Sequence, residues 1–73
     1  MKTNISKEDV VQLREELLKY ASTAEVHEFV VIAMLHCKID STIEKFESYS
    51  IEELNSMYRV VYTLIGKNAQ DYV

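Results

Sequence analysis

The longest uninterrupted apolar segment of the chain runs through seven residues, from Phe29 to Leu35. A membrane-spanning helix needs about 20 apolar residues, so this segment is too short to cross a membrane. Its β-branched residues would suit a buried strand, but the good helix formers that follow them, and the absence of Gly and Pro between Thr23 and Lys38, favour a helix. Two helical turns that are apolar all round have to be covered on every side.

A second regularity marks where helices begin. Serine followed three residues later by an acid, the pattern of a capping box, precedes four apolar periodic segments. The four pairs are Ser6/Asp9, Ser22/Glu25, Ser41/Glu44 and Ser50/Glu53. With Gly66 as a suitable residue just past a helix end, they predict helices at about 7–21, 23–38, 42–49 and 51–66 and a tail at 67–73.

The middle of the chain leaves one alternative open, a single helix from Thr23 to Ser48. We favour a break, because the side chains of Asp40, Ser41 and Thr42 can compete for backbone hydrogen bonds. The sequence therefore predicts an all-α fold in one domain, a small bundle of three to four capped helices.

The second predicted helix presents two apolar faces. One face is expected to pack on the first and last helices and contains Val26, Val30, Ala33 and Cys37. The other face is interrupted by Glu28, is expected to remain uncovered, and contains Val31, Ile32, Leu35 and Ile39. The apolar arc of the last helix spans roughly 200°, about twice the width that one core contact requires. Its narrow polar side, which includes Asn55 and Arg59, is predicted to face water.

These surplus apolar surfaces predict a protein interface. Four of its residues come from the second helix, and the last helix adds tyrosines, whose large apolar body and polar tip suit an interface and equally the rim of a small core. The predicted interface residues are Val31, Ile32, Leu35, Ile39, Tyr58, Val60, Tyr62 and Leu64.

The energy available from this interface favours a symmetric pair. Burial is worth about 1.5–3 kcal/mol per apolar side chain, so the four residues on the second helix would contribute about 6–12 kcal/mol, close to the cost of association of about 4–15 kcal/mol. A two-fold dimer uses the same patch twice. We therefore predict a homodimer that completes the bundle, or a subunit that docks on another protein.

Charge and composition exclude several functions. The formal net charge is −4, and the eight basic residues are scattered among twelve acids, so no basic stripe is available for direct nucleic-acid binding. Cys37 is the only cysteine, which precludes an intrachain disulfide and suits a reducing compartment. Met1 to Ser6 lack the apolar core of a signal peptide. The expected location is the cytoplasm.

We found no residues that predict catalysis. His36 and Cys37 are adjacent, so on a helix they point about 100° apart and cannot form a nucleophile–base pair. Together with His27 they match no zinc spacing, and the only glycine stands at a helix end, with no glycine-rich loop to cradle a phosphate. We therefore expect neither enzymatic activity nor a metal, a cofactor or a small-molecule substrate.

The carboxyl-terminal half resembles two groups of small bacterial regulators. Ile39–Lys45 followed by Glu53–Arg59 resembles the Hha/YmoA family, which has an Ile-Asp-Thr-Leu-Glu-Arg-like helix and then a Glu-Leu-x-x-Met/Phe-Tyr helix. Ile43–Asp71, with the segment Met57–Ile65, resembles the AriR/YmgB biofilm regulators. The chain departs from the Hha pattern after Tyr58, where that family is charged and this chain is apolar.

The resemblance implies a gene regulator that acts by binding a nucleoid protein of the H-NS type. The expected function is that of a small non-enzymatic helical protein that modulates a partner protein, with bacterial gene regulation as the setting. The alternative is a phage- or bacteriocin-type inhibitor or immunity protein that binds and blocks a toxin or a host enzyme.

Overall fold

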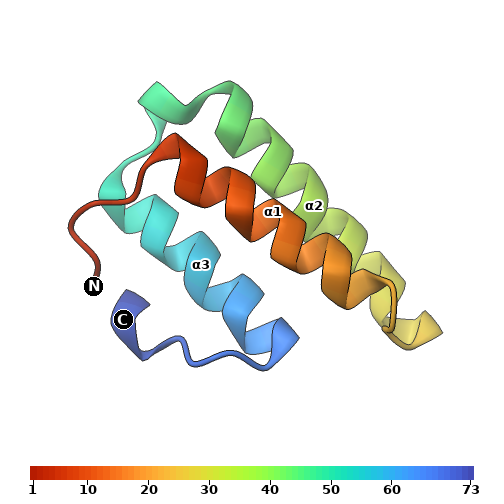
Figure 1. Cartoon of the computed structure of the whole chain (residues 1–73). Coiled ribbons are helices and arrows are strands. Elements are labelled where there is room, and N and C mark those ends of the chain that lie inside the picture. Colours follow the sequence, from red (N-terminus) through yellow and green to blue (C-terminus); the bar gives the residue numbers. More distant parts are fainter.

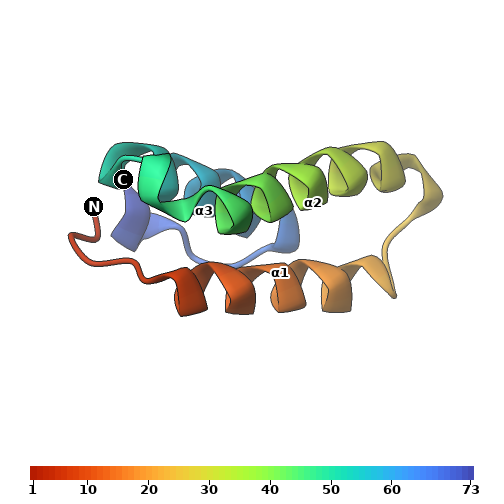
Figure 2. The same cartoon turned by 90° about the horizontal axis from the view of Figure 1, so that it is seen from above.

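The computed structural model describes all residues from 1 to 73, and every regular element in it is helical. The elements in chain order are α1 (Lys7–Ala21), η1 (Val26–Glu28), α2 (Phe29–Glu44), η2 (Phe46–Ser48), α3 (Ile51–Ile65) and η3 (Gln70–Tyr72), where η denotes a single 3-10 turn. The predicted all-α bundle is thus confirmed. Helices α2 and α3 run antiparallel to each other (Figure 1) and lie in one layer, with α1 in a second layer beneath them (Figure 2). None of the helices is both long and apolar enough to span a membrane.

Two of the four predicted capping boxes start helices. At α1 the Ser6 hydroxyl accepts from the Asp9 N–H at 3.1 Å, and the Asp9 carboxylate accepts from the Ser6 N–H at 2.9 Å. At α3 the Ser50 and Glu53 pair does the same, at 3.1 and 2.9 Å. The bounds predicted for these two helices agree with the structure to within one residue.

The other two boxes, Ser22/Glu25 and Ser41/Glu44, were predicted wrongly, and Ser41 and Glu44 lie inside α2. Ser22 ends α1, because its hydroxyl donates to the Lys19 carbonyl at 2.7 Å instead of accepting from a following amide. The chain enters η1 and α2 through a different pair, in which the Glu28 carboxylate accepts from the Glu25 N–H at 3.2 Å. Helix α2 therefore begins at Phe29, six residues after the predicted start at Thr23.

The predicted break at residues 40–42 is also wrong, because α2 continues through it to Glu44 and leaves only the single turn η2 where a helix at 42–49 was expected. The side chains of Thr42 and Asp40 both have hydrogen-bond partners that leave the helix intact. The Thr42 hydroxyl donates to the Lys38 carbonyl at 2.7 Å, within the helix. The Asp40 carboxylate is held by Arg14 of α1 at 3.1 Å and lies 3.3 Å from His36 Nδ1. The Thr42 bond to the carbonyl four residues earlier is one that a helix accommodates, and the Asp40 carboxylate bonds side chains, so neither residue breaks the helix.

The core lies between α1 and the layer above it. Eleven buried hydrophobic residues form it: Ile5, Val10, Leu13, Leu17, Ile32, Ile39, Leu54, Met57, Tyr58, Val61 and Tyr72. Helix α2 packs mainly on α1, and α3 packs on both α1 and η3. Helices α2 and α3 contact each other where the Thr42 hydroxyl lies 3.4 Å from the Met57 sulfur. Helix α1 thus covers one side of the layer that α2 and α3 form, and the space between α2 and α3 is uncovered on the opposite side.

Both ends of the chain fold back onto α3, which corrects the predicted tail. Tyr72 is only 7% exposed and stacks on Tyr58, with 4.5 Å between the ring centroids. Its carbonyl accepts from the Arg59 guanidinium at 2.8 Å. Asn55, predicted to face water, is 1% exposed because its side-chain amide pairs with both the N–H and the carbonyl of Lys2, at 3.0 and 2.8 Å.

Candidate functional site

Three of the eight predicted interface residues belong to the core of the single chain. Ile32, Ile39 and Tyr58 are between 0% and 6% exposed, so they offer no free surface. Ile32 and Ile39 point towards α1 because α2 is rotated relative to the predicted orientation. The polar partners of α2 explain this rotation. Glu28, read as an interruption of an outer face, accepts from the Tyr20 hydroxyl of α1 at 2.5 Å.

Because of this rotation, the face of α2 that was predicted to pack inward is exposed. Val26, Val30, Ala33 and Cys37, predicted to pack inward, are exposed. The large apolar side chains of η1 and the amino-terminal half of α2 form an exposed apolar strip, which we call the α2 ridge. Its members and exposed fractions are Val26 79%, Phe29 48%, Val30 70%, Val31 46% and Met34 67%. The ridge is the most exposed apolar segment of the three helices.

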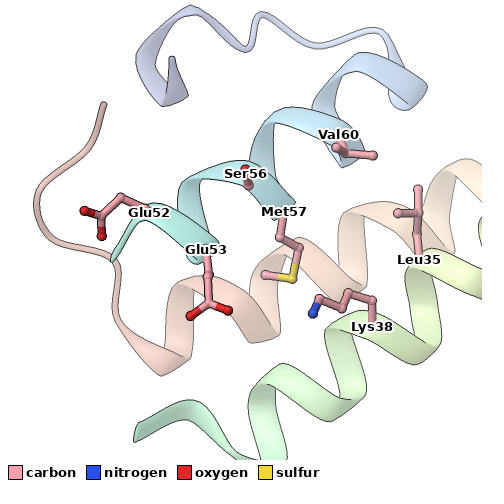
Figure 3. A pocket seen from close by; sticks show the side chains of 7 residues that line it. All are labelled: Leu35, Lys38, Glu52, Glu53, Ser56, Met57 and Val60. Carbon is pink, nitrogen blue, oxygen red and sulfur yellow. The ribbon is translucent and has the colours of Figure 1, made fainter. Parts of the chain in front are cut away.

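Beside the ridge, the space between α2 and α3 forms a cavity of about 390 Å³, which we call the α2–α3 groove. Figure 3 shows its lining side chains projecting from the two helices, with α1 passing behind them as a floor. The residues that line the groove are Leu35 and Lys38 of α2 and Glu52, Glu53, Ser56, Met57 and Val60 of α3. Its centre is therefore apolar and its rim is charged.

Four predicted interface residues follow this groove. Leu35 and Val60 line it directly. Val31 stands one turn before Leu35 on α2, and Leu64 stands one turn after Val60 on α3. Because the two helices are antiparallel, both of these positions extend the groove at the same end, which is the end beside the ridge (Figure 1).

The rim of the groove carries charges of both signs. The Lys38 ammonium lies 4.8 Å from the centroid of the Tyr49 ring, and in Figure 3 it reaches across the groove towards α3. The pKa of the Glu53 carboxyl is held below its usual value by the Ser50 N–H and hydroxyl, and secondarily by the charge of Lys38. Glu53 is therefore a carboxylate at neutral pH. It lies at the end of the groove that is beside the carboxyl terminus of α2.

The eighth predicted interface residue, Tyr62, lies away from the groove. It packs with Tyr58 and Tyr72 in a cluster of three rings, with centroids 4.5 to 5.6 Å apart. The Tyr58 hydroxyl donates to the Asp9 carbonyl at 2.5 Å, and burial raises the pKa of Tyr58 far above its usual value. The tyrosines were expected either at an interface or at the rim of the core. Tyr58 lies within the core, and Tyr62 lies at its rim.

Sequence reasoning missed several residues of the site. Met34 and Val30 form the top of the ridge, and Lys38, Met57 and Glu53 form the groove wall. The signal that could have found them is the pair Tyr20 and Glu28, eight residues apart across the turn between α1 and α2. That hydrogen bond places Glu28 on the inner face, and the opposite, purely apolar side of α2 then faces outward.

The ridge and the groove together form a largely apolar surface with charged residues along its edge. No group of three His, Cys, Asp or Glu side chains stands close enough together to hold a metal ion. Comparison with known proteins adds no relative, since no family model, no curated protein and no solved structure matches the chain.

Proposed function

We propose that this protein is a non-enzymatic interaction protein that binds a partner protein through the α2 ridge and the adjoining α2–α3 groove. The observation that carries the proposal is the exposure of Val26, Val30 and Met34, each at least two-thirds open to solvent on consecutive turns. Contiguous exposed apolar patches on small soluble domains mark interaction sites far more often than isolated apolar residues do.

The size of the surface sets a requirement on the partner. The exposed fractions of the five ridge residues and Val60 together amount to about three and a half whole side chains. At about 1.5–3 kcal/mol for each fully buried side chain, this contributes about 5–10 kcal/mol. Association costs about 4–15 kcal/mol. The surface of one chain therefore only offsets the cost of binding, and a stable complex needs a partner that contributes a comparable apolar face.

The biological setting follows from the sequence rather than from the site. The resemblance of the carboxyl-terminal half to Hha/YmoA and AriR/YmgB regulators supports a role in bacterial gene regulation, exerted on a protein partner. An acidic chain with scattered basic residues suits this indirect mode. An inhibitor that blocks a toxin or host enzyme would use the same surface, and the identity of the bound partner separates the two roles.

The proposal is tested by comparing three forms of the full chain as baits in extracts of the organism that encodes it. These are the wild type, Met34→Lys on the ridge, and Gln12→Lys as a control that adds the same charge to the exposed side of α1. Lys has a helix propensity close to that of Met, so we expect the ridge variant to fold. The wild type and the control should retain a protein that the ridge variant loses. Identical retention by all three folded forms would overturn the proposal.

A further inference from the structure

The ridge and the groove lie next to each other on one face of the molecule. Val31 belongs to the ridge and also extends the line of Leu35 into the groove, so an exposed apolar strip borders the groove along the same helix. A two-fold rotation can place an exposed apolar strip of each copy against the apolar groove of the other when strip and groove lie side by side. We propose that the occupant of the groove is a second copy of this chain, in a dimer where each α2 ridge seats in the groove of the other copy.

This proposal rests on the proposed function and names its partner. The partner has to supply an apolar face of comparable size, and a second copy supplies an identical one. In the two-fold arrangement both ridges and both grooves are covered at once. The interface therefore closes at two copies and leaves no repeating surface from which a filament could grow.

The distribution of charge favours the same arrangement. No residue from Phe29 to Leu35 is charged, whereas Val26 is flanked by Glu25, His27 and Glu28. Seating the Phe29–Leu35 part of the ridge in the groove therefore adds no charge to the contact, and Lys38 and Glu53 of the groove itself have opposite signs.

The test uses sedimentation of the full chain across about 5–200 μM, the range in which weak and moderate dimers dissociate. The wild type should sediment as a dimer at the upper end of this range. Met34→Lys on the ridge and Val60→Glu in the groove should each weaken the dimer by about a hundredfold or more, because each places an unpaired charge in an apolar contact. Gln12→Lys, on the layer away from the groove, should leave the dimer unchanged.

Mixing the two weakened variants tests the seating itself. In a mixed dimer, the Lys of one variant faces the groove that carries the new Glu of the other, while the remaining ridge and groove are both wild type. Native mass spectrometry of the equimolar mixture should therefore show the mixed dimer, although neither variant pairs with itself. Circular dichroism on each variant establishes that it is folded.

Each failure has a distinct meaning. A wild type that stays monomeric at the highest concentration overturns the dimer, and the proposed function then stands if Met34→Lys still loses a captured protein. A wild-type dimer that survives either substitution, or folded variants whose mixture stays monomeric, shows that the two copies meet through another surface. If the dimer fails and capture is also unaffected by Met34→Lys, the proposed function fails with it.

Discussion

The two sides of α3 differ in a way that its sequence conceals. One side carries Asn55 and Arg59, looks polar, and is sealed by both ends of the chain, so that Asn55 is 1% exposed. The other side carries Val60, looks apolar, and is left 52% exposed at that residue beside the groove. A polar side chain is buried here because it binds backbone, and an apolar one is exposed because no segment of this chain covers it. The open side is therefore a property of the fold, and it is the surface that we propose a partner binds.

The largest expected effect comes from opening the sealed side at Tyr72. Tyr72→Ala removes a ring that stacks on Tyr58 and is 7% exposed, and we expect it to lower the free energy of unfolding by about 3 kcal/mol. Urea denaturation monitored by circular dichroism measures this loss. The neighbouring Val73→Ala is the control, since Val73 is 68% exposed and its truncation should change stability by less than about 0.5 kcal/mol. Equal midpoints for the two variants would show that the chain end does not seal α3.

A smaller loss is expected at the opposite end of the chain. Asn55→Ala leaves the N–H and the carbonyl of Lys2 without their partner, which should cost about 2 kcal/mol. Hydrogen exchange offers a local reading, because the Lys2 amide should lose its protection in this variant. Ser56→Ala, at the adjacent exposed position, should leave that amide protected. Unchanged exchange at Lys2 in Asn55→Ala would contradict the role assigned to the asparagine.

Sequence reasoning recovered the parts of the fold that depend on local contacts. The capping boxes at Ser6 and Ser50 and the C-cap at Gly66 involve residues within one turn, so they placed α1 and α3 correctly. Two of its other errors come from side chains whose partners lie far along the chain. Asn55 binds Lys2 across 53 residues, and Asp40 pairs with Arg14 across 26.

The same limit explains the outcome for the candidate site. The apolar surplus on α2 and α3 could be predicted from composition and periodicity. Two of the eight predicted residues, Leu35 and Val60, line the groove, and two more, Val31 and Leu64, stand one turn farther along the same helices. The orientation of α2 about its own axis could not be predicted from hydropathy, because an all-apolar segment has no polar side to orient it. The Tyr20–Glu28 hydrogen bond and the Arg14–Asp40 pair both join this segment to α1, and hydropathy alone places such acids on the outside.

A pH-dependent effect should arise on the open side, at Glu53. Its folded pKa lies below the ordinary value of 4.5, because the Ser50 N–H and hydroxyl and the Lys38 charge favour the carboxylate. This stabilisation is therefore complete above the ordinary pKa and is lost as the pH falls through the lower folded value. Glu53→Gln should be less stable than the wild type at neutral pH, and the difference should shrink below about pH 4.5.

Thermal unfolding at a series of pH values between about 7 and 3 measures this difference. Glu52→Gln is the matched control, because it removes a neighbouring charge on the same helix turn without touching the capping box. The difference in stability between Glu52→Gln and the wild type should not depend on pH in the way expected for Glu53→Gln. A Glu53→Gln curve that stays parallel to the wild type through the acid range would show that Ser50 does not hold the carboxylate.

The smallest expected effect on the chain itself is at Val60, and it tests the comparison most directly. Val60 and Met57 stand three residues apart on the same groove wall, yet Met57 is 5% exposed and Val60 is 52% exposed. At concentrations where the chain is monomeric, Met57→Ala should cost about 2–3 kcal/mol, whereas Val60→Ser should change stability by less than about 0.5 kcal/mol. If Val60→Ser costs as much as Met57→Ala in dilute solution, the side chains of this chain already fill the groove.

If the groove instead receives a second copy, the cost of Val60→Ser should grow as protein concentration rises, because association adds to apparent stability by mass action. The cost of Met57→Ala includes a contribution from the core, so most of it should already be present in the monomer.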